Sequence, residues 1–262
     1  MSGDTYMQAT AELAAIAGAN AMRFYRQKLS VEAKADGTPV TIADRSTEEI
    51  ARQWIETHFP ADGILGEEFG SIRPDARRRW LIDPIDGTKS FVRGVPFWGT
   101  LVAVAEGGTV LAGAAAFPAV GETLSAGLGE GCWWNGSRCA VSQVRKLSRA
   151  TVLTSDLSFS GDAARRSAWE RLIGSAGISR TWGDCFGYLL VATGRAEVMI
   201  DPVVSAWDLA AVLPAIVEAG GVFTDWSGEQ SAFNCSAVAT NAALARQTRE
   251  ILRGPSNTEG GQ

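Results

Sequence analysis

The chain has 262 residues and a mass of 27.7 kDa, with 24 lysines and arginines against 29 aspartates and glutamates. The net charge of −5 argues against a general nucleic-acid or membrane-surface binder, because phosphate groups favour a basic protein face. The single histidine, His58, excludes a multi-histidine zinc site within one chain. Catalysis must therefore depend on carboxylates, hydroxyls, backbone groups or a cofactor.

The first sixty residues are expected to be mostly helical. Apolar residues recur at helical spacing over about residues 4–28, and a second helix is predicted from about Asp44 to His58. Residues 34–43 carry a turn signal and then an extended piece. No basic region precedes the apolar N-terminal stretch, which therefore indicates an amphipathic helix and not a signal peptide. No later segment has the roughly 18 uncharged apolar residues of a membrane span, so we expect a cytoplasmic protein without membrane partners.

Strands dominate the elements predicted between residues 63 and 142. The expected elements are a strand at 63–68 (GILGEE), a charged loop at 71–79, a buried strand at 80–83 (WLID) that stops at Pro84, and a turn into a short helix at 86–91 (DGTKSF). Gly107-Gly108 and Asn135-Gly136 mark hairpins among the strand-like stretches that follow.

The second half alternates strands and helices less regularly. Strands are predicted at 151–156, 179–184 (strand or turn), 195–201, 221–228 and 237–241, and helices at 163–173, 186–194, 206–220 and 243–252. Strands that alternate with helices in mixed order predict a layered α/β or α+β fold. We expect one unit over residues 1–262, with an N-terminal half over about 1–145, a C-terminal half over about 146–252 and a flexible tail over 254–262.

The strongest local signal is the segment Asp83–Thr88 (DPIDGT), which directly follows an apolar strand. Two unpaired carboxylates beside a buried strand repel each other, and a divalent cation such as Mg²⁺, which prefers oxygen ligands, removes that cost. Pro84 stiffens the turn and leaves the carbonyl of Ile85 as a further ligand, and Gly87 permits close approach of the backbone. If Thr88 opens a helix, the amides of Gly87 and Thr88 form an anion site. The simpler alternative is a strand and loop with solvated aspartates.

Two further acidic signals accompany this segment. Glu67 lies in GEE (66–68) at the end of an apolar strand, where the alternative is an exposed acidic loop. Asp208 lies in WDLAA (207–211) at the start of an apolar helix, where the alternative is helix capping. Capping and metal ligation exclude each other unless one carboxylate serves both.

These motifs together resemble one protein family. GEE (66–68), DPIDGT (83–88), WDLAA (207–211) and EAGG (218–221) are similar to the motifs of the inositol monophosphatase-like family of Mg²⁺-dependent, lithium-sensitive phosphomonoesterases. The resemblance extends from Lys34 to about Asn241. It implies a layered αβαβα fold of the sugar-phosphatase type and a homodimer.

The resemblance also implies a set of site residues. Two or three Mg²⁺ would be held by Glu67, Asp83, the carbonyl of Ile85, Asp86 and Asp208. A water near Glu67 and Thr88 would be the nucleophile, and Asp44 matches the carboxylate that pairs with the threonine of the DGT turn. Gly87, Thr88 and Asp86 would also contact the substrate.

A second group of residues points to the substrate. RTWGDC (180–185), GRAE (194–197) and Asp201-Pro202 resemble the histidinol-phosphatase branch of the family. Histidinol phosphate carries an ammonium group and an imidazole, which the carboxylates of Asp184 and Asp201 would pair with, and Trp182 either packs in the core or offers a stacking surface. The predicted reaction is therefore hydrolysis of histidinol phosphate to histidinol and inorganic phosphate.

Several alternatives stay open at this point. The enzyme could be an inositol-1-monophosphatase or a broader sugar-phosphate phosphatase with the same metals, or a non-catalytic protein on this scaffold. Asp184 could be a structural cap or pair with Arg180. The cluster Arg77–Arg79 suggests a solvated loop, with a dimer contact or phosphate steering as alternatives. The four cysteines are Cys132, Cys139, Cys185 and Cys235; none forms a CxxC pair, and we expect small buried hydrophobes.

Overall fold

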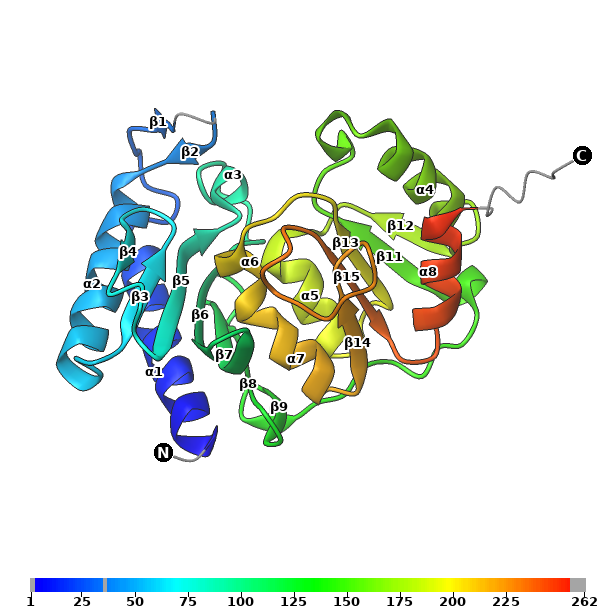
Figure 1. Cartoon of the computed structure of the whole chain (residues 1–262). Helices are drawn as coiled ribbons and strands as arrows, with labels where there is room; N and C mark the ends of the chain where they lie inside the picture. The colour runs from blue at the N-terminus through cyan, green and yellow to red at the C-terminus, as the bar shows by residue number, and fades with distance from the viewer. Residues whose placement is uncertain (1–2, 35–36, 255–262) are drawn as a thin grey trace, which may run out of the picture.

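Three layers of helices alternate with two β-sheets across the molecule (Figure 1). The first layer contains α1 (Gly3–Met22) and α2 (Ile42–His58), the middle layer α5 (Asp184–Ala192), α6 (Ala206–Ala210) and α7 (Val212–Glu218), and the last layer α4 (Ala163–Ile173) and α8 (Ala245–Arg253). This order confirms the predicted αβαβα fold. The computed structural model describes residues 3–34 and 37–254, so the predicted tail lies outside the described residues apart from Gly254.

The larger sheet has eight strands and is almost entirely antiparallel. Its strands are β3 (Gly63–Gly66), β4 (Gly70–Ile72), β5 (Arg78–Asp86), β6 (Gly99–Glu106), β7 (Thr109–Phe117), β8 (Glu122–Gly127), β9 (Gly131–Trp134) and β10 (Ser137–Arg138). Their order in space is β10-β9-β8-β7-β6-β5-β3-β4, and β3 and β5 alone run parallel. Both predicted hairpins form, at Gly107-Gly108 between β6 and β7 and at Asn135-Gly136 between β9 and β10.

The smaller sheet has five strands in the order β12-β11-β13-β15-β14. Its strands are β11 (Thr151–Thr154), β12 (Ile178–Arg180), β13 (Val198–Asp201), β14 (Gly221–Thr224) and β15 (Ala237–Asn241). The remaining short elements are β1 (Glu32–Ala33), β2 (Pro39–Val40), α3 (Thr88–Phe91) and two 3₁₀ turns at Leu147–Arg149 and Phe159–Gly161. The proposed division of the chain near residue 145 stays a prediction.

Each helix layer meets a sheet through an apolar core. Leu13 and Trp80 are fully buried between the first helix layer and the larger sheet, and Leu189 and Phe223 lie in the core between the two sheets. Leu172 belongs to the core between the smaller sheet and the last helix layer. Burial of side chains of this size contributes roughly 1.5–3 kcal/mol each. Among the described residues, no helix is long and apolar enough to cross a membrane.

Three local expectations were wrong. Helix α1 ends at Met22 and not near residue 28: the N–H groups of Arg23, Phe24 and Tyr25 bond to the carbonyl three residues earlier, and the chain then turns at Arg26, whose φ is 60°. The helix expected over 206–220 is broken at Ala211 into α6 and α7, since Pro214 has no N–H and its ring would clash with the carbonyl four residues earlier.

The third difference concerns the strand that carries the DPIDGT segment. Strand β5 does not stop at Pro84 but continues to Asp86, with a register shift against β6 between Asp83 and Asp86. This irregularity admits Pro84 because the proline need not donate a ladder hydrogen bond there. The N–H of Ile85 instead donates to Asp83 Oδ1 at 3.0 Å. The bulge therefore gathers two acidic side chains at one end of β5.

The basic cluster Arg77–Arg79 lies at the other end of β5. Arg78 and Arg79 belong to the strand itself, and Arg77 Nη2 lies 2.9 Å from Glu106 Oε1. At about 3.3 Å per residue, the cluster is roughly 20 Å or more from Asp86. The solvated-loop expectation holds for Arg77, which is exposed, but not for Arg78 and Arg79, and the alternatives of a dimer contact or phosphate steering stay predictions.

Candidate active site

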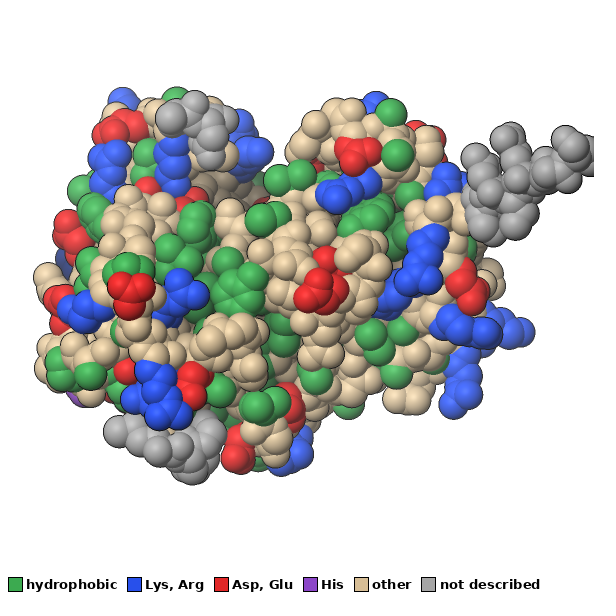
Figure 2. All heavy atoms as spheres, viewed as in Figure 1, with side chains coloured by type: hydrophobic (Ala, Val, Ile, Leu, Met, Phe, Trp, Pro, Cys, Tyr) green, Lys and Arg blue, Asp and Glu red, His purple; other side chains and the backbone are tan. Residues whose placement is uncertain are grey.

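Two adjoining cavities, of about 640 Å³ and 300 Å³, lie where β3, β5 and β13 end and where α3, α5 and α6 begin. Asp86, Lys89, Asp184 and Asp208 line both, so the two form one hollow. Figure 2 shows a notch in the surface between the lobe with β1, β2 and α3 and the lobe with α4. For clarity, the larger space is called cavity A and the smaller one cavity B.

Three acidic side chains meet on the wall of cavity A. Asp83, Asp86 and Asp208 each offer a carboxylate oxygen, and these oxygens lie within 4.8 Å of one another. Asp83 and Asp86 come from the bulged end of β5, and Asp208 from the first turn of α6. Three predicted metal ligands from distant parts of the sequence are thus brought together.

The electrostatics of this cluster favour a bound cation. Burial raises the pKa of Asp83 and of Asp86 well above the ordinary aspartate value, and the neighbouring carboxylates raise it further. Burial likewise raises the pKa of Asp208 to about 6. Three carboxylates that repel one another in a buried wall are stabilised by a divalent cation with oxygen preference. The donor set therefore fits Mg²⁺.

Two of the site aspartates also cap helices. Asp44 is the third residue of α2, and its Oδ2 accepts from the N–H of Thr41 at 2.8 Å; Asp208 is the third residue of α6, and its Oδ2 accepts from the N–H of Ser205 at 2.8 Å. The N-cap of α6 is therefore Ser205 and not Asp208, which corrects the capping alternative. In each carboxylate, one oxygen accepts the hydrogen bond from the N-cap residue of its helix, and the other oxygen remains available to the site.

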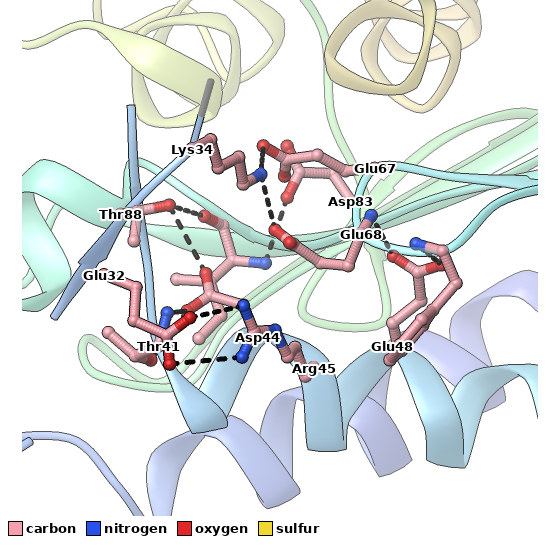
Figure 3. Close-up of polar contacts among 12 residues, drawn as sticks. Glu32, Lys34, Thr41, Asp44, Arg45, Glu48, Glu67, Glu68, Asp83 and Thr88 are labelled. Atoms are coloured by element: carbon pink, nitrogen blue, oxygen red, sulfur yellow. Dashed lines mark hydrogen bonds and ion pairs between the residues drawn. The ribbon is translucent and has the colours of Figure 1, made fainter. Parts of the chain in front are cut away.

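Thr88 links the DPIDGT turn to Asp44. Its hydroxyl lies 3.0 Å from the carbonyl oxygen of Ile85 and 3.4 Å from Asp44 Oδ1, and it has one proton to donate to either acceptor. The predicted pairing of Asp44 with Thr88 is therefore present as the longer of two contacts (Figure 3). Thr88 opens α3 as predicted, after Gly87 at a φ of 84°. A Cβ on Gly87 would lie 2.9 Å from the carbonyl oxygen of Phe97, so only glycine fits this turn.

Glu67 follows directly after β3 and lines cavity A beside Asp83. Its Oε1 is 2.7 Å from the ammonium nitrogen of Lys34, which also lies 2.7 Å from Glu68 Oε1 (Figure 3). Glu67 is not part of the three-carboxylate group within 4.8 Å. The structure therefore places Glu67 at the cavity with its carboxylate held by a lysine.

A buried ion pair holds the turn that carries Glu67. Glu48 on α2 is fully buried, and its carboxylate accepts from the N–H group of Glu68 at 2.7 Å (Figure 3). It also accepts from the N–H group of Phe69 at 3.2 Å and from Arg52 at 2.7 Å. A Cβ on Gly66 would lie 2.0 Å from Glu48 Oε1, so a glycine there admits the carboxylate. Glu48 thus positions Glu67 through the backbone of its neighbours.

Asp184 lies between the two cavities at the start of α5. It has a φ of 51°, and its N–H donates to Ser155 Oγ at 2.7 Å. Burial raises the pKa of Asp184 to about 7, with further contributions from Asp201 and Asp208. A non-glycine residue at positive φ is strained, and such strain collects at functional sites.

Asp201 ends β13 and lines cavity B. Its Oδ2 accepts from the hydroxyl of Tyr188 at 2.8 Å, and its Oδ1 from the N–H of Ser155 at 3.3 Å. Both oxygens are thus engaged within the protein, whereas the carboxylate of Asp184 lies beside Gly87, where Oδ2 would be 3.2 Å from a Cβ on that residue.

Some residues of the hollow were missed, and some expectations do not hold. Lys34 and Lys89 line cavity A, where they are the two basic side chains beside five carboxylates. Trp182 lines neither cavity but lies under the guanidinium of Arg180, 5.9 Å from its ring centre, so the stacking expectation is not supported. His58 stacks on Trp54 at a ring distance of 4.3 Å, as expected of a structural residue. No short-range signal pointed to the lysines, because their acidic partners lie far along the chain.

Comparison with known proteins shows the family to which the chain belongs. The profile of the inositol monophosphatase family matches residues 4–254. The chain belongs to the inositol monophosphatase family. A histidinol-phosphatase from Chlorobaculum parvum is 43% identical over 242 residues, which cover 92% of this chain and 93% of that protein.

More distant members of the inositol monophosphatase family agree with this assignment. An inositol-1-monophosphatase from Rhizobium meliloti is 32% identical and covers 87% of this chain and 88% of its own length. The crystal structure of extragenic suppressor protein suhB from Bartonella henselae superposes with a TM-score of 0.89 at 28% identity, covering 97% of this chain and 99% of that one. The family fold therefore extends over both sheets.

The role of Glu48 can be tested by Glu48→Gln. The amide removes the charge opposite Arg52 and one acceptor for the Glu68–Phe69 backbone, each a charge-assisted bond of roughly 1.5–3 kcal/mol. We expect Mg²⁺ to bind at least about tenfold more weakly, measured by isothermal titration calorimetry on the protein without substrate. Glu49→Gln on the exposed side of α2 is the matched control. Unchanged Mg²⁺ affinity in folded Glu48→Gln protein would contradict the positioning role.

Proposed function

We propose that this member of the inositol monophosphatase family is a Mg²⁺-dependent phosphatase that hydrolyses histidinol phosphate to histidinol and inorganic phosphate. The phosphoric monoester hydrolase class follows from the family assignment. The observation that carries the proposal is the Asp83–Asp86–Asp208 cluster next to a hollow whose second part has further carboxylates. In this proposal the cluster would bind the phosphate through Mg²⁺, and cavity B would bind the leaving group.

The metal ligands in this proposal are the residues around cavity A. Asp83, Asp86 and Asp208 would hold Mg²⁺ together with Glu67 and the carbonyl oxygen of Ile85, with two or three ions per site. Bound Mg²⁺ supplies charge neutralisation for a dianionic phosphate and lowers the pKa of a water molecule. Because acidic groups outnumber basic ones in cavity A, a phosphate dianion would be repelled without such cations.

The protein's own groups then orient the attack. Glu67 accepts a proton from the attacking water, and the hydroxyl of Thr88 fixes the position of that water. Asp44 and the Ile85 carbonyl set the direction of the Thr88 proton, since both are acceptors within 3.4 Å. Gly87 and Thr88 bring backbone N–H groups at the first turn of α3 to the phosphate.

The leaving group would occupy cavity B. Asp156, Asp184 and Asp201 line it, in addition to two of the metal-site aspartates. Histidinol carries an ammonium and an imidazole, and charge-assisted hydrogen bonds to carboxylates suit both. Asp184 is the residue expected to contact the cationic group, while Asp201 adds buried negative charge beneath it. The similarity to a named histidinol-phosphatase supports the same substrate.

The second candidate is an inositol-1-monophosphatase or a broader sugar-phosphate phosphatase with the same metal site. The named inositol phosphatase among the relatives is less similar than the histidinol-phosphatase, at 32% against 43% identity. Inositol offers only hydroxyl groups, which do not require a buried anion such as Asp184. The acidic lining of cavity B therefore favours histidinol phosphate.

An assay over a small panel of esters tests the proposed function. We expect phosphate release to require Mg²⁺, to be inhibited by Li⁺, and to show the highest kcat/KM with histidinol phosphate. Asp86→Asn should lower kcat by at least about 100-fold, because it removes a ligand charge and not a core contact. A preference for inositol phosphate would support the second candidate. Release from no ester would indicate a non-catalytic binding protein on this scaffold.

Asp184→Asn tests substrate choice directly. Asparagine tolerates positive φ and keeps the shape of the side chain, so the backbone of α5 should be unaffected. We expect kcat/KM for histidinol phosphate to fall roughly 10- to 100-fold, the value of one charge-assisted bond. The change should be smaller for a phosphate ester whose sugar carries no charge. Asp75→Asn in an exposed loop is the control. Equal losses on both esters would assign Asp184 a structural role.

The proposal also includes a homodimer and a cytoplasmic location. The dimer follows from the family resemblance, and the location stays a prediction from the N-terminal sequence. Light scattering on the purified protein should give a mass twice that of the 27.7 kDa chain. A mass of one chain at micromolar concentration would exclude the dimer.

A further inference from the structure

Cys132 and Cys139 face each other across the β9–β10 hairpin, away from the active site. Their sulfur atoms lie 3.4 Å apart, and the N–H of Cys139 donates to the carbonyl oxygen of Cys132 at 3.0 Å. Both are free thiols, and neither lines cavity A or cavity B. The expectation of small buried hydrophobes holds for Cys132 and Cys185, whereas Cys139 is half-buried and Cys235 is exposed.

The hairpin backbone brings the two residues into a geometry that suits a disulfide. Trp134 pairs with Ser137 and Trp133 with Arg138, so the next opposed pair outward is Cys132 and Cys139. A hydrogen-bonded pair of this kind has Cα atoms about 5.5 Å apart, within the usual disulfide range of about 4.4–6.8 Å. The sulfurs lie 3.4 Å apart and need to approach to about 2.05 Å for a bond to form.

The surroundings of the two thiols differ. Cys132 is 1% exposed and belongs to the apolar core between the sheets, whereas Cys139 is partly exposed at the end of the hairpin. Contact with the Cys132 thiol lowers the pKa of Cys139, and the guanidinium of Arg195 lowers it further. Thiolates are the reactive form of cysteine, so Cys139 is the accessible nucleophile and Cys132 its buried neighbour.

We propose that Cys132 and Cys139 are a reversible oxidation site that forms an intramolecular disulfide with hydrogen peroxide as the oxidant. The Cys139 thiolate attacks one peroxide oxygen, the O–O bond breaks, and the products are a sulfenic acid and hydroxide, which takes up a proton to become water. The Cys132 thiol sulfur then attacks the Cys139 sulfur, the S–S bond forms as the S–O bond breaks, and the departing hydroxide takes up the Cys132 thiol proton to become a second water. Two thiols are oxidised while one peroxide is reduced to two waters.

The disulfide would reinforce a connection between the layers. Glu218 at the end of α7 accepts from the N–H groups of Gly129 and Gly131 at the start of the hairpin. Just after Cys139, the N–H of Val141 donates to the carbonyl oxygen of Ala219. A bond across the hairpin therefore ties the two chain segments that contact α7, and it lowers the entropy of the unfolded chain. The oxidised protein should be more heat-stable, with its cavity lining unchanged.

Peptide mapping of the full-length Cys235→Ser protein tests the proposal, because Cys235 is exposed and lines cavity A. After hydrogen peroxide and alkylation, we expect Cys132 and Cys139 in one disulfide-linked species lighter by two hydrogens, reversed by dithiothreitol. The oxidised form should unfold at a higher temperature than the reduced form. Full alkylation of both thiols after peroxide, or linkage only between chains, would overturn the proposal.

Two further variants separate the roles of the thiols. In the same background, Cys132→Ser should leave Cys139 as a sulfenic acid that dimedone labels, and Cys139→Ser should leave Cys132 reduced under the same peroxide dose. Circular dichroism checks that each variant folds. Rapid oxidation of Cys132 in the Cys139→Ser protein would contradict the assignment of Cys139 as the nucleophile.

Discussion

Repulsion among buried carboxylates is the constraint on which the rest of the site depends. Asp83, Asp86 and Asp208 are held within 4.8 Å of one another, and burial together with their neighbours raises the pKa of each. Such an arrangement is unfavourable by itself, and folding energy from the surrounding cores must maintain it. Carboxylates held this close to one another favour the binding of divalent cations. The bound cations would in turn favour an anionic substrate.

The scaffold keeps these groups in place mainly through backbone hydrogen bonds. Asp44 and Asp208 each use one carboxylate oxygen to cap a helix, so the direction of the remaining oxygen follows the helix axis. Glu48 holds the turn after β3 in a similar way by accepting two backbone N–H groups. Local secondary-structure bonds thus determine where the functional oxygens point, which leaves them little freedom to relax away from a cation.

In the proposed function, the hollow has one part for the phosphate and one part for the alcohol. Cavity A is bounded by the DPIDGT turn, and the roles proposed for its groups, which concern charge and the attacking water, would be the same for any phosphate ester. Cavity B differs because Asp156 and Asp201 line it but not cavity A, while Asp184 lies at the boundary of both, and these carboxylates add negative charge where the proposed leaving group would lie. Cavity B is not independent of the proposed metal ligands, because Asp86 and Asp208 line both cavities together with Asp184.

The sequence by itself determined the order of helices and strands, the two hairpins and the acidic motifs, because turn residues and apolar spacing act over a few positions. It could not place the Glu48 carboxylate against the Glu68 N–H, 20 residues away, or Lys34 against Glu67, 33 residues away. It also missed the bulge that carries β5 through Pro84 and the break between α6 and α7. Only the tertiary structure decided which charges face one another, since ion pairing depends on distance in space and leaves no periodic trace along the chain.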